Sequence, residues 1–294
     1  MERRETFLRR ERMEMIALHL KGYNLECFHF GSQSECTTTP GLNSDIDLLI
    51  SDNTQNIMAD WRDWEYGRKN LLMLHEKITP TQQSLLHDIK KYTPEPFTSI
   101  YDDMCARKDS EQVLISAERY IQESEHIFSE RGVVTKNGPP LPNWDVVEAL
   151  SVCKPVPKKQ RWIERCRGRH SPPDQLLEAA QVAPSFLVPA GHPDSDYKRK
   201  EWRLSPNLIE RMLMLSFNMT QIKCYIVLKL IKQSLFNKMV GDLTSSFYCK
   251  TLMFYTIERT HPSQWKEHNL MFLLVQCLQV LRKRLRLGSF PIIS

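Results

Sequence analysis

Two short motifs separated by a polar loop hold the residues best suited to chemistry. Gly31-Ser32 follows the apolar run of residues 27–30, and Asp45-Ile46-Asp47 opens a second apolar run. Because residues i and i+2 of a strand point to the same face, Asp45 and Asp47 are expected to project together. Carboxylates this close repel each other unless a cation or a shared proton lies between them. Carboxylate oxygens suit Mg²⁺, and paired ions of this kind serve phosphoryl transfer.

The residues around these aspartates fit a phosphate-handling site. Glycine at position 31 lets the backbone approach a phosphate closely, and Ser32 offers a hydroxyl donor. Asp145, near the start of the apolar run 144–152, is the best placed third carboxylate. A D-x-D pattern alone is a weak signal because aspartates are common at strand edges. Asp145 can equally be an ordinary aspartate at the start of a strand.

The elements that would position these residues change in character along the chain. Strands are expected over residues 27–30, 45–50, 71–74, 144–152 and 185–188. Helices are expected over residues 2–20, 81–91, 110–129, 172–183, 207–217, 220–236, 244–259 and 268–286. The first half therefore mixes strands and helices, whereas the second half is helical. We expect an α+β protein with two lobes, a mixed-sheet N-lobe over residues 1–170 and a helical C-lobe over residues 171–294.

Composition narrows the class of protein. The 294 residues are 41% hydrophobic and 26% charged, which is typical of a globular chain. Neither G-x-G-x-x-G nor G-x-x-x-x-G-K-[ST] occurs, so the sequence does not favour a Rossmann or a P-loop nucleotide site. The net charge of +5 permits phosphate binding without requiring it. Eight scattered cysteines without a C-x-x-C pair, and no apolar run long enough to span a bilayer, predict a cytoplasmic protein with no membrane partner.

Two sets of motifs carry a resemblance to a known family. Gly31-Ser32, Asp45-x-Asp47 and Asp145 together resemble the nucleotidyltransferase fold of the DNA polymerase beta type. Further along, Trp202-Arg-Leu-Ser, Lys229 and Ser-Ser-Phe-Tyr-Cys-Lys at residues 245–250 follow in order. This series resembles the Mab-21 family, and within it the invertebrate cyclic GMP-AMP synthase-like receptors. The resemblance covers about residues 25–285.

The resemblance implies a bilobal nucleotidyltransferase fold in which a helical-bundle C-lobe closes a nucleotide cleft on a twisted mixed sheet. Asp45, Asp47 and Asp145 would be the catalytic residues and would bind two Mg²⁺ or Mn²⁺ ions. The residues implied in nucleotide binding are Gly31, Ser32, Arg203, Ser205, Lys229, Ser246 and Phe247. Among them Lys229 would contact phosphate and Phe247 would stack on a base. Without the resemblance, the last three of these positions would be interpreted as an ordinary helix face.

The chain also departs from the family pattern. It lacks the histidine- and cysteine-rich zinc insertion of the vertebrate enzyme, and Cys224 and Cys249 stand singly, so no structural zinc is expected. That absence argues against DNA as an activator. A basic segment remains at Lys158, Lys159, Arg161 and Arg165. This segment could bind the phosphates of double-stranded RNA, or it could be a solvated helix face.

Three functions stay open at this point. The first is a metal-dependent nucleotidyltransferase that joins NTPs such as ATP and GTP, a cyclic dinucleotide synthase of innate immune sensing activated by a nucleic-acid ligand. The second is a catalytically silent Mab-21-like nucleotide-binding or regulatory protein, which the short segment before Gly31 favours. The third is a linear nucleotide polymerase. The first two differ in whether the three aspartates converge closely enough to share metal ions.

Overall fold

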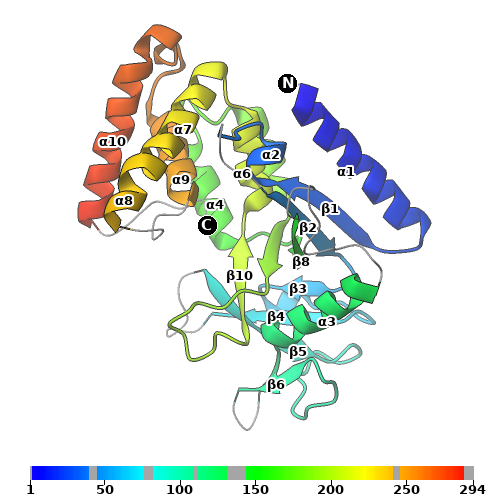
Figure 1. Ribbon diagram of the computed structural model, residues 1–294. Coiled ribbons are helices and arrows are strands. Elements are labelled where there is room, and N and C mark those ends of the chain that lie inside the picture. Colours follow the sequence, from blue (N-terminus) through cyan, green and yellow to red (C-terminus); the bar gives the residue numbers. More distant parts are fainter. Residues whose placement is uncertain are drawn as a thin grey trace.

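The computed structural model describes residues 2–39, 45–75, 82–108, 112–130, 144–240 and 246–287. Its strands are β1 (Leu25–Phe30), β2 (Ile46–Asp52), β3 (Asn56–Met58), β4 (Asn70–Leu74), β5 (Gln83–Ile89), β6 (Cys105–Arg107), β7 (Val113–Ile115), β8 (Trp144–Val152), β9 (Ser185–Val188) and β10 (Glu201–Ser205). Its α-helices are α1 (Glu2–Leu20), α2 (Gly31–Ser34), α3 (Ala117–Glu130), α4 (Pro157–Cys166), α5 (Asp174–Val182), α6 (Asn207–Leu215), α7 (Met219–Ile231), α8 (Asn237–Val240), α9 (Ser246–Arg259) and α10 (Leu270–Leu287). Figure 1 shows most of the helices gathered beside one twisted sheet, which confirms the α+β class.

The described strands form a single mixed sheet. Its main path runs β1-β2-β8-β9-β10-β5-β4-β3, and β6 and β7 extend it from β5. The pairs β2–β8 and β3–β4 are parallel, and the other pairs of neighbouring strands in the described residues are antiparallel. In the β2–β8 pair Asp47 lies directly opposite Asp145. Phe30, the residue before Gly31, lies opposite Asp47 from the other side. The topology thus brings three distant segments together at one end of β2.

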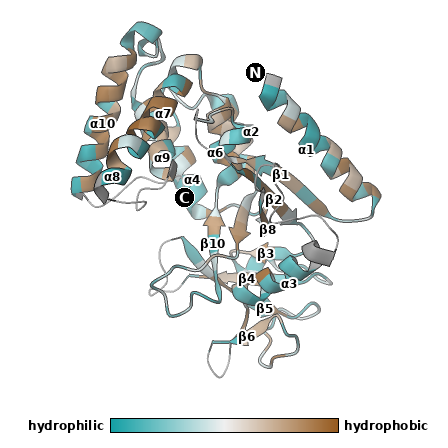
Figure 2. Ribbon diagram, viewed as in Figure 1, coloured by the Kyte–Doolittle hydropathy of each residue, from teal (hydrophilic) through white to brown (hydrophobic). Residues whose placement is uncertain are grey.

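Separate apolar cores hold the helices and the sheet. Trp162 of α4, Leu177 of α5 and Ile209 of α6 pack in one buried cluster with residues of α7, α9 and α10. Trp202 and Leu187 lie in a second cluster with residues of β4, β5 and β8. Figure 2 shows the corresponding apolar residues on the strands and on α7, α9 and α10.

Segments on both sides of residue 170, where we expected the two lobes to divide, contribute to the helical core and to the sheet. α4 precedes that position, yet it packs within the helical cluster. β9 and β10 follow it, yet they fill the middle of the sheet between β8 and β5. The chain therefore passes from the sheet to the helices, back to the sheet, and then to the helices again. A single cut cannot separate the two layers.

Helix α1 lies along β1 (Figure 1) and connects the two layers through a buried ion pair. Both guanidinium nitrogens Nη1 and Nη2 of Arg211, in α6, donate to the Glu11 carboxylate at 2.6 and 3.1 Å. The guanidinium also lies over the rings of Phe28 and Phe30, 5.6 and 5.3 Å from their centroids. Glu11 further accepts a hydrogen bond from the backbone N–H of His29. This network fixes α6 against the strand that leads into Gly31.

The helix expected over residues 81–91 is wrong for the described residues of that range, because Gln83–Ile89 forms strand β5. All seven residues of β5 are buried between neighbouring elements, so the strand has no polar face to give it a period of two. The range 110–129 likewise divides into β7 and α3. The strands expected at 144–152 and 185–188 are confirmed.

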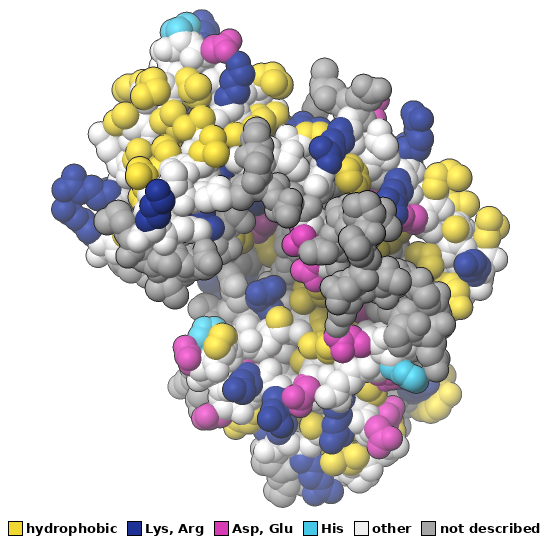
Figure 3. Space-filling view, in the orientation of Figure 1, with side chains coloured by type: hydrophobic (Ala, Val, Ile, Leu, Met, Phe, Trp, Pro, Cys, Tyr) yellow, Lys and Arg dark blue, Asp and Glu magenta, His cyan; other side chains and the backbone are white. Residues whose placement is uncertain are grey.

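The molecular surface carries exposed apolar side chains on α1, on the sheet side and on the helical layer. On α10 they include Met271, Phe272 and Val275, which are 73, 55 and 48% exposed. Figure 3 shows hydrophobic side chains gathered over the region where Figure 1 places α10 and α7. No helix in the described segments is long and apolar enough to cross a membrane.

Candidate active site

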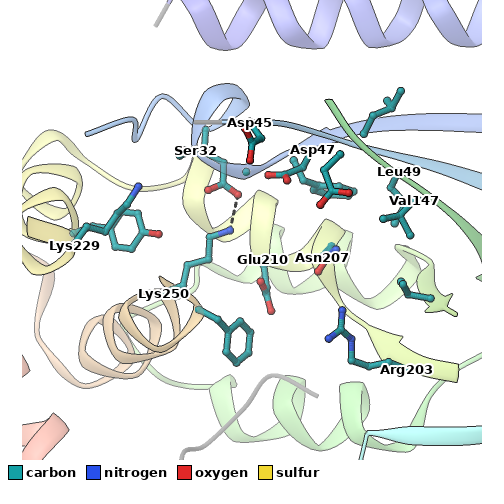
Figure 4. Close-up of a pocket in the computed structure, with 18 of the residues that line it drawn as sticks. Ser32, Asp45, Asp47, Leu49, Val147, Arg203, Asn207, Glu210, Lys229 and Lys250 are labelled. Atoms are coloured by element: carbon teal, nitrogen blue, oxygen red, sulfur yellow. Dashed lines mark hydrogen bonds and ion pairs between the residues drawn. The ribbon is translucent and has the colours of Figure 1, made fainter. Parts of the chain in front are cut away.

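A pocket of about 480 Å³ opens between the sheet and the helices. One wall comes from the sheet side, with Gly31 and Ser32 of α2 beside the carboxylates of β2 and β8. The other wall comes from the helices (Figure 4). Among the residues singled out from the sequence, the structure places Gly31, Ser32, Asp45, Asp47, Asp145, Arg203, Lys229 and Phe247 in this pocket. These residues come from distant parts of the chain.

Asp47 and Asp145 form the centre of the acidic wall. They are opposed residues on neighbouring parallel strands, so their side chains leave the same face of the sheet. Asp45 lies just before β2 and lines the same pocket. In the described residues, however, no three His, Cys, Asp or Glu side chains gather closely enough to hold a metal ion. Asp45 is nevertheless near enough for its charge to contribute to the raised pKa of Asp47.

Gly31 is required by the position of the Asp47 carboxylate. The backbone of Gly31 has a φ of +77°, a conformation that side chains other than glycine rarely adopt. A β-carbon at this residue would lie 1.7 Å from Oδ2 of Asp47. The glycine thus provides both the turn from β1 into α2 and the space in which the carboxylate lies.

Burial and crowding disfavour the charged form of Asp47. Burial, followed by the charge of Asp145, raises the pKa of Asp47 to about 6, and the cationic Lys250 offsets part of that effect. A divalent cation beside the two carboxylates would remove this repulsion. Carboxylate oxygens are hard ligands of the kind that Mg²⁺ prefers, so the donor set fits such an ion in chemical type.

The floor of the pocket contains an ion pair that we did not predict from the sequence. Lys250 Nζ lies 2.8 Å from Glu35 Oε1 (dashed in Figure 4), and the Glu35 side chain is only 2% exposed. Glu210 also lines the pocket and helps, with Glu35, to keep the pKa of Lys250 raised against the effect of burial. The only sequence signal was position: Lys250 ends the Ser-Ser-Phe-Tyr-Cys-Lys motif, and Glu35 lies one helical turn after Gly31.

The helical wall places further polar and aromatic groups around the pocket. Lys229 Nζ donates to the backbone carbonyl of Thr37 at 3.0 Å and lies 5.6 Å from the ring centroid of Tyr225. Burial lowers the pKa of Lys229. Phe247, at the start of α9, and Arg203, on β10, line both this pocket and an adjoining one of about 400 Å³.

Two residues implied in nucleotide binding, Ser205 and Ser246, are not among the described residues that line the main pocket. Ser205 lines the adjoining pocket, where its hydroxyl donates to Asn207 Oδ1 at 2.6 Å. Ser246 is the first residue of α9, and its side chain falls outside the part of the chain that the structure describes.

The basic segment on α4 does not present all of its cations to solvent. Lys159 Nζ donates to the carbonyls of Gln181 and Ala183 at 3.1 and 2.8 Å. Arg165 pairs with the buried Glu258 at 3.1 Å. Both cations thus contribute to the packing of the helices, and RNA binding by this segment stays a prediction. Lys158 and Arg161 belong to the same helix, and Arg161 is exposed.

The comparison with known families is consistent with this site. Residues 220–292 match the family described as the Mab-21 protein HhH/H2TH-like domain. The matched segment contains Lys229, Phe247 and Lys250, which form part of the helical wall of the pocket. This segment is therefore similar to the Mab-21 domain, and that similarity supports a nucleotidyltransferase-like class. No curated protein sequence matches the chain.

Proposed function

We propose that this protein is a metal-dependent nucleotidyltransferase that joins NTPs, with a cyclic dinucleotide as its product. One observation carries the proposal. Asp47 and Asp145 are opposed on parallel strands, next to a glycine turn that leaves room for the carboxylate. The facing helices supply lysines and an aromatic ring to the same pocket.

The pocket offers each part of a nucleotide a suitable partner. The hydroxyl of Ser32 and the ammonium of Lys229 would bind the triphosphate, because both lie on the pocket wall close to the acidic residues. Phe247 offers a ring on which a base can stack. Arg203 would donate to a second base or phosphate where the two pockets adjoin.

The proposed reaction is an in-line displacement at phosphorus. The 2′- or 3′-hydroxyl of one nucleotide attacks the α-phosphate of another, a new P–O bond forms, and the bond to pyrophosphate breaks. The hydroxyl proton passes to the carboxylate of Asp145. A bound divalent cation, held by Asp47 and Asp145 with Asp45, would supply positive charge to the reacting phosphate. In a second displacement, the free hydroxyl of the linear dinucleotide attacks the α-phosphate of its remaining triphosphate, a second pyrophosphate leaves, and the ring closes.

A role in innate immune sensing, with a nucleic-acid ligand such as double-stranded RNA as activator, is part of the proposal. The supporting argument is the resemblance to the cyclic GMP-AMP synthase-like receptors together with the net charge of +5. Lys159 and Arg165 are not assigned to the RNA surface, because their cations bind helix carbonyls and Glu258.

A turnover assay tests the proposal. The protein is incubated with all four NTPs and Mg²⁺ or Mn²⁺, with and without double-stranded RNA or DNA, and products are identified by mass spectrometry. Asp47→Asn and Asp145→Asn serve as isosteric controls. We expect a cyclic dinucleotide that both variants fail to make. Linear oligomers would instead indicate a polymerase.

A second candidate is a catalytically silent nucleotide-binding protein of the same family. Two observations favour it: no three-carboxylate group gathers in the described residues, and Lys250 is already paired with Glu35. This candidate predicts that NTPs bind but are recovered unchanged under every condition of the assay. Binding measured by calorimetry, with no product, would replace the first candidate with this one.

A further inference from the structure

The turn that follows β1 is closed by its own backbone. The N–H of Glu35 donates to the carbonyl of Gly31 at 3.1 Å, and the N–H of Thr37 donates to the carbonyl of Ser32 at 2.9 Å. Gly31 and Ser32 line the candidate active site. Helix α2 has only four residues, and so short a helix is not stable by itself. The geometry of the turn therefore depends on the contacts that hold it from outside.

Cations from three helices make such contacts. Arg4 of α1 donates through Nε and Nη2 to the backbone carbonyl of Glu35, at 3.3 and 3.2 Å. Lys229 of α7 donates to the backbone carbonyl of Thr37 at 3.0 Å. Lys250 of α9 pairs with the carboxylate of Glu35 at 2.8 Å. The helices thus hold the turn at two residues just beyond α2.

The contact made by Lys250 differs from the other two because both of its partners are charged. A hydrogen bond between two charged groups is shorter and stronger than one to a neutral carbonyl. The side chains of Lys250 and Glu35 are only 16% and 2% exposed, so water cannot readily replace either partner. Removing the lysine would leave a buried carboxylate without its cation, which is strongly unfavourable. This pair is therefore the strongest of the three contacts.

Helix α9 also carries the ring that lines the far side of the pocket. Phe247 and Lys250 are three residues apart, so they lie on the same face of the helix, and both line the pocket. Figure 4 shows the side chain of Lys250 reaching from α9 toward the segment that carries Ser32. One turn of helix thus connects the aromatic side of the pocket to the glycine turn.

We infer that Lys250 is a positioning residue. Through Glu35 it fixes the turn of residues 31–37 against α9. This contact orients the hydroxyl of Ser32 toward a phosphate of the nucleotide whose base stacks on Phe247. The inference rests on the proposed function in one respect, because it takes a nucleotide as the ligand of the pocket.

The two lysines of the helical wall then have different roles. Lys229 is bound to a neutral carbonyl, and its ammonium can exchange that carbonyl for a phosphate oxygen, a stronger acceptor. When it does so, the turn loses the contact at Thr37. The pair between Lys250 and Glu35 would keep the turn in place while the phosphate is bound.

Hydrogen exchange of the free protein, followed by mass spectrometry, tests the positioning without a ligand. In Lys250→Met we expect the amides of residues 31–39 to exchange at least tenfold faster, the loss expected for one charge-assisted contact. The amides of β8 and α10 should keep their rates. Lys223→Met removes a lysine that pairs with Glu267 at the surface, and this matched control should leave residues 31–39 unchanged.

Two results would overturn the inference. One is unchanged exchange at residues 31–39 in folded Lys250→Met. The other is an equal acceleration throughout the chain, which would show only a loss of overall stability. If Lys250→Met does not fold, Glu35→Gln decides, because it removes the charge and keeps the size of the side chain. The double variant should exchange no faster than the more affected single variant, since both changes break one contact.

ATP binding, measured by calorimetry with Mg²⁺, tests whether the turn serves a phosphate. Glu35→Gln removes a negative charge from the pocket wall, so electrostatics alone would strengthen the binding of ATP. Positioning predicts the opposite: ATP should bind at least tenfold more weakly, whereas adenosine, which has no phosphate, should bind equally to both proteins. Tighter ATP binding by Glu35→Gln would contradict the inference. If the wild type binds no ATP, the proposed function fails, and hydrogen exchange still decides whether Lys250 positions the turn.

Discussion

The Cα of Gly31 lies so close to the Asp47 carboxylate that the two residues exclude any side chain between them. The turn that ends β1 and the acidic end of β2 therefore form one unit, joined across an antiparallel pair. Whatever ligand the aspartate holds, its position depends on the backbone of this turn.

The first prediction concerns that turn. Gly31→Ala should destabilise the protein by about 2 kcal/mol or more, because alanine disfavours a φ of +77° and its methyl group would displace Asp47. Urea unfolding followed by circular dichroism measures the change. Ser32→Ala, one residue further on, should leave stability within about 0.5 kcal/mol of the wild type. Equal stability of Gly31→Ala and the wild type would refute the close packing.

The second prediction concerns the repulsion at Asp47. Since its pKa rises from 3.8 to about 6 in the folded protein, the folded state holds this proton more tightly than the unfolded chain does. In buffer without divalent cations, the contribution of Asp47 should therefore lower stability as pH rises from about 4 to 6. Asp47→Asn should remove that slope and stabilise the protein at pH 7 by about 1 kcal/mol, a value reduced for partial solvent exposure.

Unfolding free energies measured at pH 4.5, 5.5 and 7.0 check this behaviour, with EDTA present throughout. Asp52→Asn, on the same strand, is the matched control for the loss of one carboxylate. If Asp47→Asn were less stable than the wild type at pH 7, the two carboxylates would not repel each other in the folded state.

A third prediction follows from the chemistry of the acidic wall. Mg²⁺ that binds only the folded protein should raise its stability, by about 2.7 kcal/mol at a concentration one hundred times the dissociation constant. Asp145→Asn should abolish most of this increase. Thermal melts over a Mg²⁺ series at constant ionic strength provide the measurement. An equal rise in both proteins would show that the cation binds elsewhere.

The fourth prediction concerns the pair between α1 and α6. Arg211→Met should cost about 3–5 kcal/mol, because it leaves the buried Glu11 carboxylate without its cation. The double variant Glu11→Leu/Arg211→Met should recover much of that loss. Arg10→Met, which breaks an exposed pair with Glu14, should cost less than about 1 kcal/mol. If the double variant were as unstable as the sum of the two single changes, the pair would not be coupled.

A fifth prediction separates structural from exposed cations on α4. Lys159→Met should lower stability by about 2 kcal/mol, because its ammonium donates to two carbonyls at the end of α5. Arg161→Met, on the exposed face, should have little effect on stability. Chemical denaturation of both variants measures the difference. If Lys159→Met lost no more stability than Arg161→Met, the two hydrogen bonds of Lys159 would contribute nothing to the stability of the protein.

The sequence was sufficient for elements with a clear apolar run or a helical period. β8 and β9 were predicted with their observed bounds. β5 was missed because its burial on both faces removes the alternation of polar and apolar residues. The same reasoning could place Asp45 and Asp47 on one strand face, but the pairing of Asp47 with Asp145 depends on the order of strands, which no local pattern encodes.

The pocket was predicted in part. The motif residues on the sheet side and Lys229, Phe247 and Arg203 line it together. Glu35, Glu210 and Lys250 could not be foreseen, because a buried ion pair between distant residues leaves no signal in spacing. Lys159 and Arg165 show the converse limit of the sequence. A basic segment shows charge, but only the folded chain shows where those charges bind.

The repeated passage of the chain between sheet and helices has a mechanical consequence. Within residues 144–240 the chain crosses three times, from β8 to α4, from α5 to β9 and from β10 to α6. Each crossing contains a proline: Pro155, Pro184 and Pro206. Proline fixes φ at about −65°, so each of these links has restricted backbone freedom. Motion of the helices relative to the sheet, which would change the width of the pocket between them, is therefore expected to be limited by all three links together.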